Sequence, residues 1–416
     1  MPESRRPPSM AILMLLIGIP PFATDTYLAA MPAMGASLDA SPATVQLTLT
    51  GFLLGVAVGQ LVLGPISDGI GRKPFLLVGS AAFVVLSGLA AVAPNGAVLV
   101  TVRILQGLAA AAGIVCGRAV ITDYFPPDRA ARRFAIVVSA GLVGPVVAPM
   151  LGGLILSVGT WRAVFLFLGA LGAVMLAGVV FRIPESLPPQ RRHPRSLGAS
   201  LTRMSELLRD KLFRGHLVTS CLAMAGFFTY IAGSSFVLQD VYAIGESTYT
   251  AIFATNALAM VTASVTFTAL VKRIKATTLR AVGLGGTVTA SAAMLAVGLL
   301  GVPGLLWAWT ALCVLTAGMG LVLPASIALV QNAGRRYAGT ASALQGGAQM
   351  LCGALISPLT GLIGTSSVVG MATVMVGFML ASAVAARFLT RPGGGARQVV
   401  VTGPRNDVRE PVQEGR

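Results

Sequence analysis

The chain alternates long apolar stretches with short polar breaks, and its basic residues fall almost entirely in every second break. The breaks on one side hold 27 of the 30 Lys and Arg residues. The breaks on the other side hold only Arg162, while Arg103 and Arg118 lie within an apolar stretch. Membrane proteins keep Lys and Arg in their cytoplasmic loops in this way. The pattern therefore predicts twelve membrane crossings with both termini in the cytoplasm.

The apolar stretches have the length that a membrane requires. Each crossing of the roughly 30 Å hydrocarbon layer needs about 20 apolar residues. With 55% hydrophobic and 11% charged residues, the chain is too apolar for a soluble domain of this size. The first stretch is too long for a cleaved signal peptide and further spans follow it. We therefore expect an all-α membrane protein whose transmembrane helices lie near 11–31, 44–66, 74–93, 97–119, 134–157, 161–181, 215–238, 249–271, 280–300, 304–330, 339–363 and 366–386.

The longest polar break divides these twelve helices into two groups of six. It is rich in Pro and in charged residues, which is typical of a linker, and apolar residues at helical spacing from Leu197 to Leu212 indicate a short surface helix within it. A cytoplasmic linker between two six-helix bundles is what repeat-built transporters show. The expected order is a cytoplasmic N-terminus, a first six-helix bundle, the linker, a second six-helix bundle and a disordered cytoplasmic tail, at 1–10, 11–181, 182–214, 215–390 and 391–416.

The composition also excludes several functions. The net charge of +16 is expected to flank the membrane, where it contacts anionic lipid, and no nucleic-acid partner is expected. The four cysteines lie in apolar stretches and are interpreted as small packed hydrophobes. A metalloenzyme or haem protein would need more ligands than the two histidines near the linker provide. We therefore expect no metal and no cofactor.

A tight charged turn lies between the second and third helices. It reads Gly64-Pro65-Ile66-Ser67-Asp68-Gly69-Ile70-Gly71-Arg72-Lys73-Pro74. Asp68 ends one helix, and Arg72 and Lys73 begin the next, so opposite charges lie close together. Without further information, this turn is an ordinary hairpin on the basic side of the membrane.

Two charged residues are predicted at similar depth within the membrane. Asp25 is the one acidic residue well inside a predicted span, beside Pro20 and Pro21, which interrupt backbone hydrogen bonding. At 1.5 Å per residue, Asp25 and Arg103 each lie roughly 21 Å from the cytoplasmic face. Burial favours a neutral carboxyl and a nearby cation favours a charged one, so Asp25 beside Arg103 is able to bind and release a proton. Two alternatives are a static ion pair that joins two helices and an Arg103 that extends to the outer face.

The fifth predicted helix carries small residues every three or four positions. These are Gly144, Ala148, Pro149, Gly152 and Gly153. Small residues at this spacing let helices approach one another closely. A packing role is therefore expected for all five.

These segments together resemble the signatures of the major facilitator superfamily. The turn from Gly64 to Lys73 resembles its cytoplasmic loop signature, and Arg103 followed by Gln106-Gly107 resembles its second signature. The segment from Gly144 to Gly153 resembles the motif of its antiporter branch, with Ala148 where Gly is usual. That substitution weakens the match for antiport as opposed to symport.

Finer features resemble the Bcr/CflA branch of drug/proton antiporters, the type that exports bicyclomycin and chloramphenicol. The likeness runs from about Ile17 to Arg391 and departs from the branch at Ala29-Ala30, where Pro-Ala is frequent. The segments that carry it are Asp25-x-Tyr27-Leu28 with Pro32, Gln60, Trp161-Arg162, Pro184-Glu185-Ser186-Leu187, Phe227 to Ile231, Phe236 to Gln239, Asn256-Ala257, Ala343 to Gly346 and Ser357-Pro358.

The resemblance implies the major facilitator fold and a multidrug efflux transporter of the bacterial inner membrane that exchanges drug for protons. Asp25 and Arg103 are then expected to couple the proton. The loop residues are expected to latch the two halves in the outward-facing state, with Asp68 at the N-terminal end of the eleventh span, where the helix dipole favours an anion. These latch residues are Gly64, Asp68, Gly71, Arg72 and Lys73. We expect a monomer, since the two halves together enclose one pathway.

Aromatic and amide side chains are candidates for the drug cavity, because they adapt to varied apolar compounds. Packing and contact with lipid are the alternative roles. A narrower proton-coupled exporter of a sugar, an amino acid derivative or a self-made antibiotic is the alternative function. No Ser/His/Asp set or phosphate-binding loop favours an enzyme, and no ring of filter groups favours a channel. The cavity candidates are Phe22, Tyr27, Phe227, Phe228, Tyr230, Asn256, Gln345 and Gln349.

Overall fold

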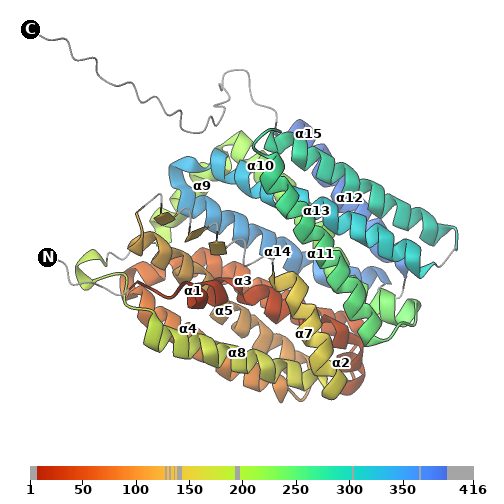
Figure 1. Ribbon diagram of the computed structural model, residues 1–416, viewed down its shortest axis with the longest axis horizontal. Helices are drawn as coiled ribbons and strands as arrows, with labels where there is room; N and C mark the ends of the chain where they lie inside the picture. The colour runs from red at the N-terminus through yellow and green to blue at the C-terminus, as the bar shows by residue number, and fades with distance from the viewer. Residues whose placement is uncertain are drawn as a thin grey trace, which may run out of the picture.

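The computed structural model of the chain is helical throughout the residues that it describes, which are 7–126, 129–130, 133–134, 136–137, 143–192, 197–301, 304–364 and 367–390. Side chains are described at these positions except at 65, 191, 197, 199–200 and 357–364. The helices form two groups that lie side by side, one coloured red to yellow in Figure 1 and the other green to blue. The tail expected at 391–416 lies outside the described residues.

The first group starts with an interrupted helix. α1 (Met10–Asp25) is followed by a 3₁₀ turn, η1 (Leu28–Ala30), and by α2 (Met31–Leu38). The span expected near 11–31 is confirmed as one segment long and apolar enough to cross a membrane, Met10–Leu38, but it is interrupted after Asp25 and continues to Leu38. The other helices of the group are α3 (Pro42–Ile70), α4 (Arg72–Ala91), α5 (Gly96–Tyr124), α7 (Gly144–Val158) and α8 (Trp161–Arg182).

A short connecting region leads to the second group. It contains the 3₁₀ turn η2 (Pro189–Arg191) and α9 (Leu197–Arg209), which confirms the expected surface helix. α9 ends before Leu212 because Asp210 begins the next helix, its Oδ1 accepting the Phe213 amide at 2.7 Å. The second group consists of α10 (Lys211–Phe236), the π-helical turn η3 (Val237–Val241), α11 (Glu246–Leu270), α12 (Ala276–Leu299), α13 (Leu305–Ala333), η4 (Arg335–Tyr337), α14 (Ala338–Gly364) and α15 (Val368–Phe388).

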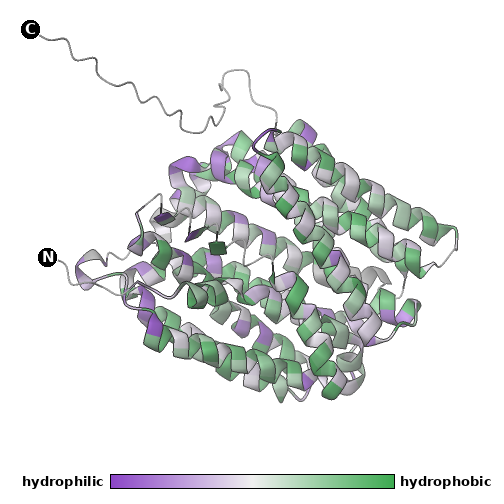
Figure 2. Ribbon diagram, in the orientation of Figure 1, coloured by the Kyte–Doolittle hydropathy of each residue, from purple (hydrophilic) through white to green (hydrophobic). Residues whose placement is uncertain are grey.

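The helices have the length and surface of membrane-spanning segments. In the described residues, 10 helical segments are long and apolar enough to cross a membrane, and α7 is a shorter apolar helix. Large apolar side chains such as Val78 (70% exposed) and Phe181 (81% exposed) face outward from the bundle. Figure 2 shows hydrophobic residues along the lengths of the helices and hydrophilic ones gathered toward their ends. Twelve crossings stay a prediction.

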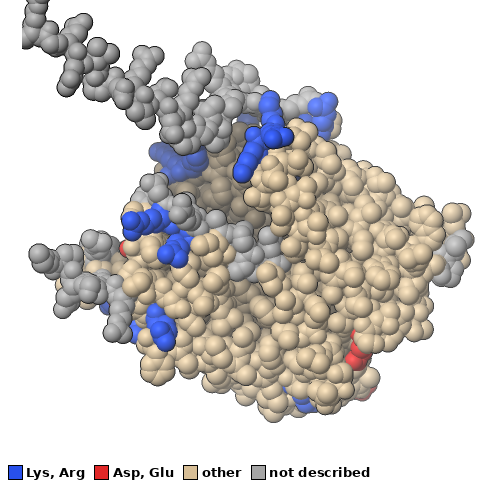
Figure 3. Space-filling view, viewed as in Figure 1, with Lys and Arg blue, Asp and Glu red and all other residues tan. Residues whose placement is uncertain are grey.

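The two ends of the bundle differ in charge. We call the end at which α1 begins and α3, α5 and α8 finish the basic end, and the other the opposite end. Among the described residues, the opposite end holds Arg162 as its basic residue. Figure 3 shows Lys and Arg side chains grouped around the basic end, where the surface is hollowed.

Small residues allow the helices of the first group to approach closely. A Cβ at Gly55 would lie 2.0 Å from the Ile104 carbonyl oxygen, and one at Gly107 would lie 2.1 Å from the Phe52 carbonyl oxygen. α3 and α5 therefore touch backbone to backbone in both directions, as small residues permit in membrane helices. This contact fixes the position of the α5 side chains relative to α1 and α3.

The two groups meet at the opposite end through hydrogen bonds to backbone carbonyls. Ser235 Oγ donates to the Leu28 oxygen at 2.6 Å, and Gln239 Nε2 donates to the Ala29 oxygen at 3.0 Å. Gln46 Nε2 of α3 donates in the other direction to the Ala232 oxygen of α10 at 3.2 Å. The contacts join the irregular turn after α1 to the end of α10, and they close the opposite end between the two groups.

Candidate functional site

Asp25 is the last residue of α1 and lies where the helix breaks. The helix passes through Pro20 and Pro21 and ends only after Asp25, so the prolines do not themselves terminate it. The Asp25 side chain is 8% exposed, and Thr24 Oγ1 donates to its Oδ1 at 2.7 Å. Thr26 Oγ1 donates to the Phe22 carbonyl at 2.5 Å. Side-chain hydroxyls thus satisfy polar groups that the helix end leaves without a backbone partner.

Arg103 of α5 is fully buried beside this break. Its Nη2 donates to the Ala23 carbonyl oxygen at 2.8 Å and its Nε to the Thr48 carbonyl oxygen at 3.3 Å. Its Nη1 donates to Gln106 Oε1 at 2.6 Å. The guanidinium therefore ties α1 and α3 to α5. The alternative in which Arg103 extends to the outer face is wrong, because the side chain has no exposed surface.

Asp25 and Arg103 lie near one another without forming an ion pair. Within the described residues, no nitrogen of Arg103 comes within 4.0 Å of an Asp25 oxygen. The charge of Arg103 lies over two aromatic rings, with 4.4 Å to the Phe52 centroid and 4.9 Å to that of Tyr27. The static ion pair is therefore wrong in this conformation. α1 and α5 are joined by the Arg103–Ala23 hydrogen bond.

The second group contains an aromatic cluster. The Tyr230 hydroxyl accepts a hydrogen bond from Asn256 Nδ2 at 3.1 Å, and its ring stacks on Phe253 with centroids 5.6 Å apart. The ring of Tyr249 lies 5.9 Å from that of Phe253. Asp25 lies close to the interface between the two groups, because the carbonyl of Leu28, three residues later, accepts a hydrogen bond from Ser235 of the second group.

The predicted cavity residues separate into two sets. Tyr27 is fully buried inside the first group, where its hydroxyl lies 3.3 Å from Thr48 Oγ1 and its ring 5.7 Å from that of Phe165. It packs within that group rather than facing the second. Phe22 is half-buried and lies near Gly144 of α7.

The second set belongs to the second group. The rings of Phe227 and Tyr230 lie 5.9 Å apart, and Phe228 packs directly against Gly353 of α14. The structure therefore brings Phe227, Tyr230 and Asn256 together and places Phe228 between α10 and α14.

Gln345 and Gln349 lie one turn apart on α14. Gln349 Nε2 donates to Ser220 Oγ of α10 at 2.6 Å. Gln345 Oε1 accepts a long hydrogen bond of 3.4 Å from Gln331. Both amides are buried and face neighbouring helices of the second group.

The small residues of α7 pack against both groups. A Cβ at Gly152 would lie 2.0 Å from the Thr26 carbonyl oxygen, so α7 presses on the break that follows Asp25. Gly153 lies against Thr250 of α11, and Gly144 lies against Pro21. Ala148 is fully buried, and Pro149 lies within the helix. The segment joins the interrupted helix to the second group.

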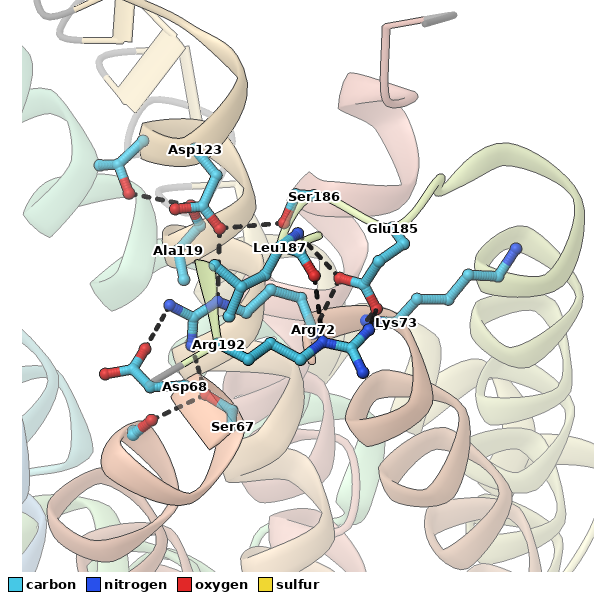
Figure 4. A network of polar contacts seen from close by, with 12 residues as sticks. Ser67, Asp68, Arg72, Lys73, Ala119, Asp123, Glu185, Ser186, Leu187 and Arg192 are labelled. Atoms are coloured by element: carbon cyan, nitrogen blue, oxygen red, sulfur yellow. Dashed lines mark hydrogen bonds and ion pairs between the residues drawn. The ribbon is translucent and has the colours of Figure 1, made fainter. Parts of the chain in front are cut away.

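The charged turn forms a network at the basic end, shown in Figure 4. Arg72 forms a salt bridge with Asp68, donates from Nε to Asp123 Oδ2 at 3.3 Å and donates from Nη1 to Ser67 Oγ at 2.5 Å. Gly71 has φ +112°, a conformation that glycine adopts without strain and that allows α3 to turn sharply into α4. Gly64 contributes its carbonyl oxygen, which accepts from Ser67 Oγ at 2.8 Å.

Glu185 caps the first turn of α4 in the same network. Its Oε1 accepts the Arg72 amide at 3.0 Å, and its Oε2 accepts the Lys73 amide at 3.3 Å. The Lys73 ammonium donates to the Val180 carbonyl at 3.0 Å. A carboxylate is favourable at this position because the first amides of a helix lack backbone partners and the helix dipole is positive there.

Sequence reasoning missed Asp123 and Glu185 as members of this network. Ser186 Oγ donates to Asp123 Oδ2 at 2.9 Å. The segment after α8 is therefore bound to the network at both Glu185 and Ser186. The available signal was charge, because the described acidic residues are few and these two lie near the ends of α5 and α8 on the basic side. The contact of Asp68 with the start of the eleventh span stays a prediction, because the pairing described for Asp68 is with Arg72.

The arrangement combines a buried carboxyl group at a helix break with a cluster of aromatic rings and amides in the other helical group. In the part of the chain that the structure describes, no group of three or more His, Cys, Asp and Glu residues suits a metal ion.

Comparison with known proteins gives consistent results. The family model described as Major Facilitator Superfamily matches residues 13–358. The chain is 33% identical to the uncharacterized MFS-type transporter YdgK of Bacillus subtilis, over 88% of this chain and 92% of the relative. It is 31% identical to a bicyclomycin resistance protein homolog of Haemophilus influenzae, over 66% and 70% of the two chains. It is 34% identical to a chloramphenicol resistance protein of Pseudomonas aeruginosa, over 57% and 56%.

Solved structures share the arrangement of the helices. A D-xylose–proton symporter matches with a TM-score of 0.71 at 15% identity, over 92% of this chain and 98% of the other. A bacterial homolog of the human lysosomal transporter Spinster, in an inward-facing and unoccupied conformation, also matches with a TM-score of 0.71, at 17% identity over 92% and 95% of the two chains. At these identities the likeness concerns the fold alone.

Proposed function

Since the chain belongs to the major facilitator superfamily of membrane transporters, we propose that it exports small amphipathic drugs in exchange for protons. It is a multi-pass membrane protein that acts on small molecules within a lipid bilayer, and the expectation of a transporter rather than an enzyme is confirmed by its relatives. The expected resemblance to the bicyclomycin and chloramphenicol resistance type is confirmed as well.

The finer parts of the proposal concern placement and partners. The protein crosses the bacterial inner membrane twelve times with both termini in the cytoplasm, so the basic end faces the cytoplasm. It works as a monomer without cofactor or nucleic acid, and the proton is its coupling ion. The drug-resistance relatives and the grouping of Lys and Arg at one end support this proposal.

The observation that carries the proposal is the place of Asp25. It is a buried carboxyl at the end of a broken helix, beside the interface between the halves and without an ion-pair partner within the described residues. A carboxyl without a fixed counter-charge changes its protonation when water or a charged group approaches it. Arg103 holds the adjacent backbone in place and so positions the carboxyl.

Alternating access follows from where the halves touch. Ser235 and Gln239 close the opposite end against Leu28 and Ala29, while the surface is hollowed at the basic end. Drug enters from the cytoplasm and proton leaves Asp25. The contacts at the opposite end then open, Asp25 takes a proton from outside and the drug leaves. The loop network keeps the cytoplasmic ends of α3, α4, α5 and α8 together during this motion.

The proposal is tested by proton movement in everted membrane vesicles. Addition of chloramphenicol or another exported drug to vesicles that contain the protein should make the lumen more alkaline, because each drug molecule that enters drives protons out. A protonophore should abolish accumulation of the drug. Accumulation that persists with the protonophore present would refute proton coupling.

A further inference from the structure

A polar strip runs along α14 between the basic end and the middle of the bundle. It consists of Ser342, Gln345 and Gln349, which share one face of the helix at spacings of three and four residues. The strip faces both halves. Arg118 Nη1 of α5 donates to Ser342 Oγ at 3.4 Å, and Gln349 donates to Ser220 of α10.

Two hydrogen-bond donors lie at this strip, one without an acceptor and one with a distant neutral acceptor. Gln345 is 3% exposed, and within the described residues its Nε2 has no hydrogen-bond partner. A buried amide nitrogen without a partner is unfavourable, which indicates that another group accepts its hydrogen bond in some state of the protein. Its Oε1 already accepts from Gln331.

Arg118 is the second donor. It is half-buried, its hydrogen bond to the neutral Ser342 is long, and among the described residues no carboxylate lies within 4.0 Å of it. Buried cations in membrane proteins are usually paired or functional. Arg72, by contrast, has two carboxylates around it. Within the described residues, Arg118 is thus a cation without a counter-charge, and its contact with Ser342 places it between the two groups of helices.

The strip lies on the route from the cytoplasm to Asp25. Arg118 precedes the end of α5 by six residues, which places it roughly 9 Å from the basic end, while Asp25 lies roughly 22 Å from it. The hollow in Figure 3 opens at the same end. A molecule that enters from the basic end therefore meets Arg118 and Gln345 before it reaches Asp25.

From this juxtaposition we infer that Arg118 and Gln345 bind an anionic oxygen group of the substrate, so that the protein selects amphipathic monoanions such as aromatic carboxylates. The inference rests on the proposed function and adds the substrate class. A carboxylate accepts charge-assisted hydrogen bonds from a guanidinium, and it can also accept the hydrogen bond that an unpaired amide N–H donates. One cation matches one negative charge, so dianions and cations are disfavoured.

The charge balance has a consequence for energetics. Export of a monoanion in exchange for one proton moves negative charge out and positive charge in. The inside-negative membrane potential therefore drives both movements. Transport of such a substrate is electrogenic, with twice the charge movement expected for a neutral drug.

A binding experiment with two matched probes tests the inference independently of transport. The full-length protein in lipid nanodiscs is titrated with 1-naphthoate and with its uncharged analogue 1-naphthamide. We expect naphthoate to bind about tenfold more tightly, which is the effect of one charge-assisted contact. Arg118→Gln should remove the preference, Arg118→Lys should keep most of it and Gln345→Leu should reduce it several-fold. Arg162→Gln, at the opposite end, is the matched control that keeps the wild-type preference.

The outcomes separate the inference from the proposed function. Equal affinity for the two probes, no binding of naphthoate or an unchanged preference in Arg118→Gln, with thermal unfolding of that variant as in wild type, overturns the inference. A naphthoate preference that depends on Arg118 supports it even when vesicles show no proton exchange. In that case the proton-antiport proposal fails and the binding site stands.

Discussion

Arg103 Nη2 donates to the backbone carbonyl of Ala23 at 2.8 Å, two residues before the carboxyl that a buried cation would be expected to neutralise. The hydrogen bond satisfies an oxygen at the end of α1, where carbonyl groups lack helical partners. Because the guanidinium is held by this oxygen, by Thr48 and by Gln106, it supports the helix break without fixing the charge of Asp25. A guanidinium that holds the backbone and a carboxyl that it does not pair with thus lie side by side.

Asp25→Asn should abolish coupling and leave the fold intact. Asn has the same shape and still accepts from Thr24 Oγ1, but it cannot exchange a proton. We expect the lumen of everted vesicles to show no alkalinisation on addition of drug, while drug binding by the purified protein remains. Drug export against a gradient by this variant would remove Asp25 from the mechanism. Asp39→Asn, at an exposed position of the opposite end, should behave as wild type.

Arg103→Met should destabilise the first half. The substitution keeps much of the apolar stem and leaves the oxygens of Ala23, Thr48 and Gln106 without their donor. Each unsatisfied buried acceptor costs about 1–3 kcal/mol, so we expect a clear fall in the thermal unfolding midpoint of the purified protein. Arg103→Lys should restore part of the loss, since an ammonium reaches only some of these acceptors. Wild-type stability of Arg103→Met would contradict the structural role.

A disulfide between α7 and α11 should hold the opposite end closed. A Cβ at Gly153 would lie 3.1 Å from Thr250 Cβ, close to the Cβ separation of about 3.5–4.5 Å in disulfides. We expect the Gly153→Cys/Thr250→Cys double variant, in a background without the four native cysteines, to lose drug transport on oxidation and to regain it with reductant. Each single variant is the control. Full transport by the oxidised protein would show that these helices need not separate.

Glu185→Ala should slow transport without weakening drug binding. The carboxylate caps the amides of Arg72 and Lys73, and loss of a helix cap costs about 1 kcal/mol. We expect a lower maximal rate at an unchanged half-saturating drug concentration, measured as initial uptake into vesicles. Glu185→Gln keeps an acceptor and should have a smaller effect. A large change in the half-saturating concentration at a normal rate would place Glu185 in drug binding instead.

Much of the helical arrangement could be predicted from the pattern of apolar stretches and basic breaks. The surface helix α9 and the turn at Gly71 also follow from local sequence. The two prolines Pro20 and Pro21 predicted an interruption of the first helix beside Asp25, and α1 does end at Asp25, but for a different reason. The helix continues past them, and Arg103 and the hydroxyls of Thr24 and Thr26 hold the groups at its end.

The residues of the candidate site could be predicted from the sequence better than the contacts between them. Depth along two helices placed Asp25 and Arg103 in one layer, but only the rotation of each helix decides which atoms meet. The same holds for Tyr27, which packs inside the first half, and for Tyr230, which stacks on Phe253 in the second. Asp123 and Glu185 contact Arg72 from segments distant in the chain, and although their charge marks them as candidates, one sequence does not show which charged residues meet.

Glu185, whose carboxylate caps the start of α4, lies on the linker that connects the first half to the second. A change in this linker can therefore act on the turn at Gly71 directly, through Glu185, without a change in the residues that contact the drug. We therefore expect a shorter linker to change the rate of transport and to leave the choice of substrate unchanged.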